Sequence, residues 1–153
     1  MHLQALAQSG FHISWRGLGG NVLWVDVKGI HTRASLAQDR AEAWRNVVRS
    51  ADVFVTDYSQ ALILIDADGV AAMTSRGVIP YPGAFLVNDA QLPTFTEYAD
   101  RINERGITRR VFVSPQQALD WAMARARLSR LAHPHRSKAP SAVGEPAALP
   151  PGG

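Results

Sequence analysis

Cysteine is absent from this chain of 153 residues, which excludes disulfide bonds, thiolate metal sites and cysteine nucleophiles. Lysine is nearly absent, with Lys28 and Lys138 the only two. No segment reaches the roughly 18 apolar residues of a membrane-spanning helix. The first eight residues lack the basic start and long apolar centre of a signal peptide. These absences predict a cytoplasmic protein without a membrane span.

Complete catalytic motifs are also lacking. The glycine-rich segment at residues 17–21 has no following Gly-Lys-Ser/Thr, and it precedes a strand rather than a helix, so we interpret it as a turn. There is no Gly-x-Ser-x-Gly nucleophile elbow. The sequence therefore predicts no catalytic residue, no cofactor and no metal site, and favours a protein that is not an enzyme.

Hydrophobic residues make up 46% of the chain, enough to fill one core. We expect a single domain over residues 10–132, preceded by a short lead-in at 1–9. The tail, residues 133–153, is rich in proline, glycine and alanine and has few large apolar side chains. Because such a segment cannot offset the entropy of ordering, we expect the tail to be disordered.

The spacing of apolar residues predicts alternating strands and helices. Alternation at 11–15, the glycine-rich break and an apolar run at 22–27 indicate an N-terminal hairpin. Short apolar runs at 84–87 and 110–113 are typical of buried strands. Apolar residues at helical spacing predict helices over 35–50, 68–76, 92–105 and 115–130, with Thr32 or Ser35 capping the first and Ser114 the last.

The segment 52–65 allows two interpretations. It is either one bent or bulged strand, or two strands joined by a turn at Tyr58-Ser59, and we favour separate segments over 53–57 and 61–65. Strands separated by helices indicate a largely parallel sheet. The predicted fold class is α/β, with a small, mostly parallel sheet, an N-terminal antiparallel hairpin and flanking helices.

Two segments carry a family resemblance. Asp57-Tyr58-Ser59, followed by Ile65-Asp66-Ala67-Asp68-Gly69-Val70, resembles the Asp-x-Ser and Ile-Asp-Ser-Ser-Gly-Leu pattern of STAS domains. Residues 106–121, which end in Ala-Leu-Asp-Trp, resemble the closing strand and helix of small SpoIIAA-like domains. The chain thus resembles the STAS family of anti-sigma-factor antagonists over residues 10–130, and the expected fold is STAS/SpoIIAA-like.

The resemblance implies regulation by protein–protein binding in bacterial signalling, with a kinase or an anti-sigma-type regulator as the partner. The implied contact residues are Tyr58, Ser59, Asp66, Asp68 and Gly69. Asp68 stands where the family carries a phosphorylated serine. The usual phosphorylation switch is therefore missing, and a permanent charge, smaller than that of a phosphate, takes its place.

Three other interpretations remain open. Asp66 and Asp68 are also suited to capping a helix N-terminus. In the second interpretation, Asp57, Asp66 and Asp68 are the carboxylates of a small nucleotide- or cation-binding enzyme. In the third, the protein is a nucleic-acid accessory protein that uses residues 105–138, which carry eight basic side chains and one acid, Asp120, and thus a net charge of +7. Nucleic-acid binding is less favoured than protein binding, because no exposed aromatics are expected between the arginines.

Overall fold

The computed structural model describes residues 11–35, 51–75 and 78–132. Our predictions for the lead-in 1–9, for the tail 133–153 and for most of the helix at 35–50 lie outside the described residues. The elements are β1 (Phe11–Gly17), β2 (Val22–Thr32), β3 (Val53–Leu64), α3 (Ala67–Ser75), β4 (Gly83–Leu86), α4 (Leu92–Asn103), β5 (Arg109–Phe112) and α5 (Pro115–Ala132).

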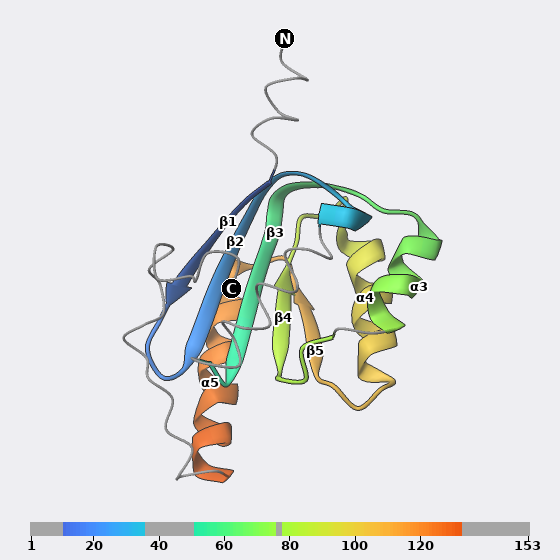
Figure 1. Ribbon diagram of the computed structural model, residues 1–153. Coiled ribbons are helices and arrows are strands. Elements are labelled where there is room, and N and C mark those ends of the chain that lie inside the picture. Colours follow the sequence, from blue (N-terminus) through green and yellow to red (C-terminus); the bar gives the residue numbers. More distant parts are fainter. Residues whose placement is uncertain (1–10, 36–50, 76–77, 133–153) are drawn as a thin grey trace.

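The five strands form one sheet whose spatial order is the order of the sequence (Figure 1). β1 pairs with β2 in antiparallel fashion, and β2, β3, β4 and β5 are parallel. The α/β class, the N-terminal hairpin and the parallel remainder of the sheet are confirmed. Helix α5 packs on one face of this sheet and α4 on the other.

The glycine-rich break at 17–21 is the predicted turn. Gly19, Gly20 and Asn21 all have positive φ, at 79°, 59° and 63°. Glycine and asparagine tolerate this conformation better than other residues, which explains why the reversal occurs here. The turn is closed by the N–H of Leu18, which donates to the carbonyl of Val22 over 2.9 Å.

Helix boundaries follow the capping residues that the sequence indicated. The hydroxyl of Ser114 accepts the N–H of Gln117 at 3.3 Å, at the start of α5. Gly106, with φ of 80°, follows the last turn of α4. Thr32 and Ser35 bond reciprocally, since each hydroxyl accepts the other residue's N–H, and the chain is helical from Arg33 to Ser35. Thr32 thus occupies the N-cap position of the predicted helix.

Both faces of the sheet are buried. On the α5 face, Trp24 and aliphatic residues of β2, β3 and β4 meet three fully buried alanines, Ala118, Ala122 and Ala126. Their small size allows the helix to approach the sheet closely. On the opposite face, an aromatic cluster joins β3, β4 and α4 and consists of Tyr58, Phe85, Phe95 and Tyr98.

The favoured division of residues 52–65 into two strands is wrong, because β3 is one strand of 12 residues that contains a bulge. Its pairing with β2 shifts between Asp57, opposite Asp26, and Gln60, opposite Lys28. The residues predicted to form a turn lie within the strand, where the Asp57 carboxylate accepts the N–H of Ser59 at 2.9 Å. An Asx-type contact of this kind favours a local reversal in isolation, but pairing with β2 on both sides keeps the strand continuous.

Gly83 allows β4 to pass directly beneath the ring of Phe54. A Cβ atom at residue 83 would lie 2.5 Å from the Phe54 Cζ atom and 2.8 Å from Cε1. We predict that Gly83→Ala lowers the free energy of unfolding by about 1–3 kcal/mol, because the buried ring has to move. The measurement is urea unfolding of wild type and variant.

The control for this prediction is Phe54→Leu, which removes most of the ring. In the Phe54→Leu background, Gly83→Ala is expected to cost clearly less than it does in the wild type, since the two residues are in contact. An equal cost in both backgrounds would show that the ring is not the cause.

Candidate functional site

The turn between β3 and α3 contains three of the five predicted contact residues, and Asp66 caps the helix there. The Oδ1 atom of Asp66 accepts the N–H of Gly69 at 2.7 Å, and its carbonyl accepts the N–H of Val70 at 3.0 Å. Both bonds are those of an N-cap residue. The capping interpretation is therefore confirmed for Asp66, whose side chain is nonetheless exposed.

Asp68 lies in the first turn of α3 and is exposed. A carboxylate at this place complements the positive end of the helix dipole. Asp68 is therefore the acid of this turn whose side chain is not the cap, and the one best placed to receive a cation from a partner.

Gly69 is buried, and its role is to allow the tight turn. A Cβ atom at this residue would lie 2.6 Å from Cγ2 of Ile65 and 3.1 Å from Oδ1 of Asp66, the oxygen that forms the cap. Any side chain would push the capping carboxylate away. Gly69 thus supports the shape of the turn rather than offering a contact surface of its own.

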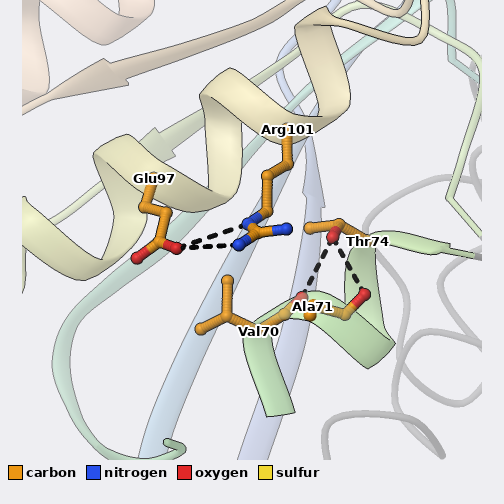
Figure 2. A network of polar contacts seen from close by, with 5 residues as sticks. All are labelled: Val70, Ala71, Thr74, Glu97 and Arg101. Carbon is orange, nitrogen blue, oxygen red and sulfur yellow. Dashed lines mark hydrogen bonds and ion pairs between the residues drawn. The ribbon is translucent and has the colours of Figure 1, made fainter. Parts of the chain in front are cut away.

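Hydrogen bonds hold the C-terminal end of α3, both within the helix and from Arg105, which follows α4. The hydroxyl of Thr74 donates to the carbonyls of Val70 at 3.0 Å and Ala71 at 3.1 Å, as Figure 2 shows. In the same view Arg101 of α4 forms an ion pair with Glu97 and faces α3. Arg105 donates to the carbonyl of Thr74 at 2.7 Å. The C-terminal end of α3, opposite the turn, is therefore held in place by hydrogen bonds.

Tyr58 and Ser59 lie at the β3 bulge and not at the turn. Ser59 stands five positions before Leu64 in this strand, a distance of about 17 Å at the usual rise of a strand. The ring of Tyr58 packs on Phe95, with ring centroids 4.7 Å apart. The hydroxyl of Ser59 donates to the Asp57 carboxylate at 2.5 Å. The structure thus separates the five predicted contact residues into a bulge pair and a turn group.

Two residues that sequence reasoning missed hold the bulge, namely Asn88 and Gln91 in the loop before α4. The Gln91 side-chain amide donates to the carbonyls of Tyr58 at 2.8 Å and Ala61 at 2.7 Å. The Asn88 amide donates to the carbonyl of Ser59 at 3.0 Å. Because β4 ends opposite Asp57, these amides replace a neighbouring strand as hydrogen-bond donors.

A sequence signal for this pair existed. The side chain of Asn88 accepts the N–H of Gln91 at 2.9 Å, and the side chain of Gln91 accepts the N–H of Asn88 at 3.0 Å. Reciprocal bonding over a spacing of three residues is the arrangement of a capping box. The spacing indicated a helix start, but nothing in it indicated the long-range bonds to β3.

An apolar surface adjoins the turn. Leu62 and Leu64, the residues of β3 just before it, each expose 54% of their surface. They are paired with Ile30 and Thr32 of β2 and lie on the same face of the sheet as these residues. The bulge reverses the alternation of the strand, so that Ala61 is buried while Leu62 and Leu64 point outward. We call Leu62, Leu64, Asp66 and Asp68 the β3–α3 surface.

The three carboxylates of the cation-binding interpretation do not form a metal site in the described residues. Among the residues that the structure describes, no group of three histidine, aspartate or glutamate side chains could hold a metal ion, so Asp57, Asp66 and Asp68 do not gather around one. In the same part of the chain, no helix is long and apolar enough to cross a membrane.

Within the described residues, the basic stretch is not exposed throughout. Arg109 is 3% exposed, and its guanidinium donates to the carbonyls of Ile79 and Tyr81, both at 2.6 Å. It therefore cannot join Arg110, Arg125, Arg127 and Arg130 in the exposed basic edge that a nucleic-acid role would use.

Comparison with known proteins does not assign the chain to a family: no family model matches it, and neither does any curated protein.

Proposed function

We propose that this protein is a non-enzymatic, STAS/SpoIIAA-like regulatory protein that acts by binding another protein through the β3–α3 surface. The observation that carries the proposal is the composition of that surface. Two exposed leucines, Leu62 and Leu64, and two exposed carboxylates, Asp66 and Asp68, lie within seven residues of the chain. Exposed apolar side chains beside fixed charges are typical of a protein-binding surface.

The order of the elements supports the family part of the proposal. A leading antiparallel hairpin, a parallel remainder of the sheet and a helix that starts directly after β3 agree with the arrangement expected for a STAS/SpoIIAA-like fold. Asp68, which the resemblance aligns with the phosphorylated serine, lies in the first turn of that helix. Its charge is constant, so the protein binds its partner without a kinase-controlled switch.

The surface also defines the chemistry of the partner. Two carboxylates attract a partner that presents arginine or lysine, and arginine has the geometry for bidentate bonds to a carboxylate. The leucines need an apolar side chain from the same partner. We expect a segment with basic and apolar residues, of the kind that an anti-sigma-type regulator or a kinase presents.

The test separates the charge of Asp68 from the capping role of Asp66. Asp68→Arg is expected to reduce recovery of the partner more than tenfold in quantitative mass spectrometry of complexes purified from native cells. Because Asp68 complements the dipole of α3, the reversal of its charge is expected to lower the free energy of unfolding by about 1 kcal/mol, which leaves the protein folded. Asp66→Ala is expected to lower the free energy of unfolding by a similar amount, about 1 kcal/mol, through loss of the cap, but without placing a positive charge in the surface.

The matched control is Asp100→Arg, the same change of charge on the exposed face of α4. Recovery of the partner is expected to be unaffected by this variant. Equal recovery with wild type and Asp68→Arg, or a partner that is neither a kinase nor a regulator of transcription initiation, would contradict the proposal.

A further inference from the structure

The two outer edges of the sheet differ in their protection against further pairing. β1 forms one edge and β5 the other (Figure 1). An edge strand carries backbone N–H and C=O groups that point away from its single neighbour, and these groups are a template for pairing with another strand. Natural proteins block such edges with short strands, bulges, proline or lysine, or by covering them.

The β5 edge is short and partly covered. This strand has only four residues, Arg109–Phe112. The N–H of Gly83 in β4 donates to the carbonyl of Thr108, so the backbone groups of Arg109 point outward. The Asn103 side chain bonds to both of them, since it accepts the Arg109 N–H at 2.7 Å and donates to the Arg109 carbonyl at 2.9 Å. Asn103 therefore hinders a further strand from pairing with β5.

The β1 edge is longer and more regular. This strand has seven residues, Phe11–Gly17, and contains neither proline nor lysine. It pairs with β2 along its whole length without a register shift. Three of its residues, Phe11, Ile13 and Trp15, are of the aromatic and β-branched types that favour strands. Within the part of the chain that the structure describes, no strand lies beyond β1, so its outer edge is open to pairing.

Alternate residues of β1 direct their backbone groups toward this edge. The N–H of Leu18 donates to the carbonyl of Val22 at 2.9 Å, which marks these two residues as a hydrogen-bonded pair. Such pairs alternate along an antiparallel ladder. The even-numbered residues of β1 therefore bond to β2, and the odd-numbered residues from 11 to 17 point their N–H and C=O groups away from it.

We propose that two copies of this chain associate through β1, and that the two β1 strands pair in antiparallel fashion around a two-fold axis at Ser14. In this register, residue 13 of one copy lies opposite residue 15 of the other, and residue 11 lies opposite residue 17. Every outward-facing residue of β1 then has a partner, and the two sheets become one continuous sheet. This edge is separate from the β3–α3 surface and does not depend on the function proposed for it.

A second copy fits this edge better than an unrelated strand does. Two identical antiparallel strands are self-complementary around a two-fold axis, which is the commonest symmetry of protein dimers. The charge of Arg16 does not oppose the pairing, because Arg16 already forms an ion pair with Asp26 of β2 at 3.2 Å. Ser14, on the proposed axis, is small and uncharged, so the two copies place no like charges directly opposite each other there.

The first test is the mass of the full chain in solution as a function of concentration. In sedimentation equilibrium, we expect the average mass to rise from that of one chain toward that of two. Because strand pairing at an edge buries a small area, the association is expected to be weak and reversible. A chain that stays monomeric up to about 0.5 mM would overturn the proposal.

Two variants at Ile13 separate the backbone from the side chain. Ile13→Pro removes an N–H that points away from β2, and proline is tolerated at such positions of edge strands, so we expect the fold to persist. Its dimerisation is expected to weaken by about tenfold or more, since the symmetric pairing loses two hydrogen bonds. Ile13→Ala retains the N–H and is expected to dimerise like the wild type. Urea unfolding verifies that both variants are folded, and equal dimerisation of wild type and Ile13→Pro would contradict pairing through this edge.

A single cysteine reports the register. The chain has no cysteine, and Ser14→Cys places one on the proposed axis. Opposite residues of a non-hydrogen-bonded antiparallel pair have Cα atoms about 4.5 Å apart, which allows a disulfide. Oxidation with copper–phenanthroline is expected to convert Ser14→Cys into a cross-linked dimer, whereas the control Gln60→Cys, an exposed residue of β3, stays monomeric on a non-reducing gel. Equal cross-linking of the two variants, or none of Ser14→Cys, would overturn the proposed pairing.

Discussion

Replacement of Arg109 by methionine is expected to lower the free energy of unfolding by about 2–4 kcal/mol. The guanidinium is buried and donates to three carbonyls, those of Ile79, Tyr81 and Thr108, over 2.6–2.9 Å. It also lies over the ring of Phe54, 4.8 Å from the centroid. Methionine fills a similar volume but donates no hydrogen bond, so buried carbonyls lose their donors. Urea unfolding measures the effect.

Lysine at the same position is expected to recover less than half of the loss. A single ammonium group cannot reproduce the planar fork that reaches Ile79 and Tyr81 together. Arg110→Met is the matched control: Arg110 is the next residue along β5 and is exposed, so its loss is expected to cost less than about 0.5 kcal/mol. Equal effects of Arg109→Met and Arg110→Met would contradict a structural role for the buried guanidinium.

Gln91→Ala is expected to lower the free energy of unfolding by about 2–3 kcal/mol. One side chain donates to the carbonyls of Tyr58 and Ala61 and accepts the N–H of Asn88, so its removal affects three backbone groups. The bulge lies between these two carbonyls and beyond the end of β4. Urea unfolding gives the global cost, and hydrogen exchange of the amides at 58–61 reports the local one.

Gln91→Glu tests whether the donors are the cause. Glutamate retains the acceptor for Asn88 but places a carboxylate against two carbonyls, so its cost is expected to equal or exceed that of alanine. Gln117→Ala, on the exposed side of α5, is the control and is expected to be neutral. A neutral Gln91→Glu would show that the amide bonds do not stabilise the bulge.

Most of the fold could be predicted from local patterns. The strands at 84–87 and 110–113 are observed at Gly83–Leu86 and Arg109–Phe112, and the helix at 68–76 is observed at Ala67–Ser75. Capping residues and glycines set these boundaries, and both act within a few residues of the chain. The N-cap role of Asp66 is local in the same way, because the N–H group that it accepts belongs to Gly69, three residues along the chain.

The arrangement of the predicted contact residues could not be predicted from the sequence. Tyr58 and Ser59 are close to Asp66 in the sequence, but an extended strand separates them in space. Proximity in sequence gives proximity in space for a turn or a helix, whereas a strand adds about 3.3 Å per residue. The favoured turn at Tyr58-Ser59 therefore implied a compact site that the continuous strand does not form.

The sequence by itself determined the α/β class, the hairpin, the helix ends and the cap at Asp66, because each follows from the preferences of neighbouring residues. Only the tertiary structure decided that β3 is continuous, that Leu62 and Leu64 face outward, and that Arg109 is buried. Each of these depends on groups more than 25 residues away, namely β2, Gln91 and the carbonyls of Ile79 and Tyr81. Buried hydrogen-bonding groups need a partner wherever the fold places them. The local sequence does not reveal which distant residue supplies that partner.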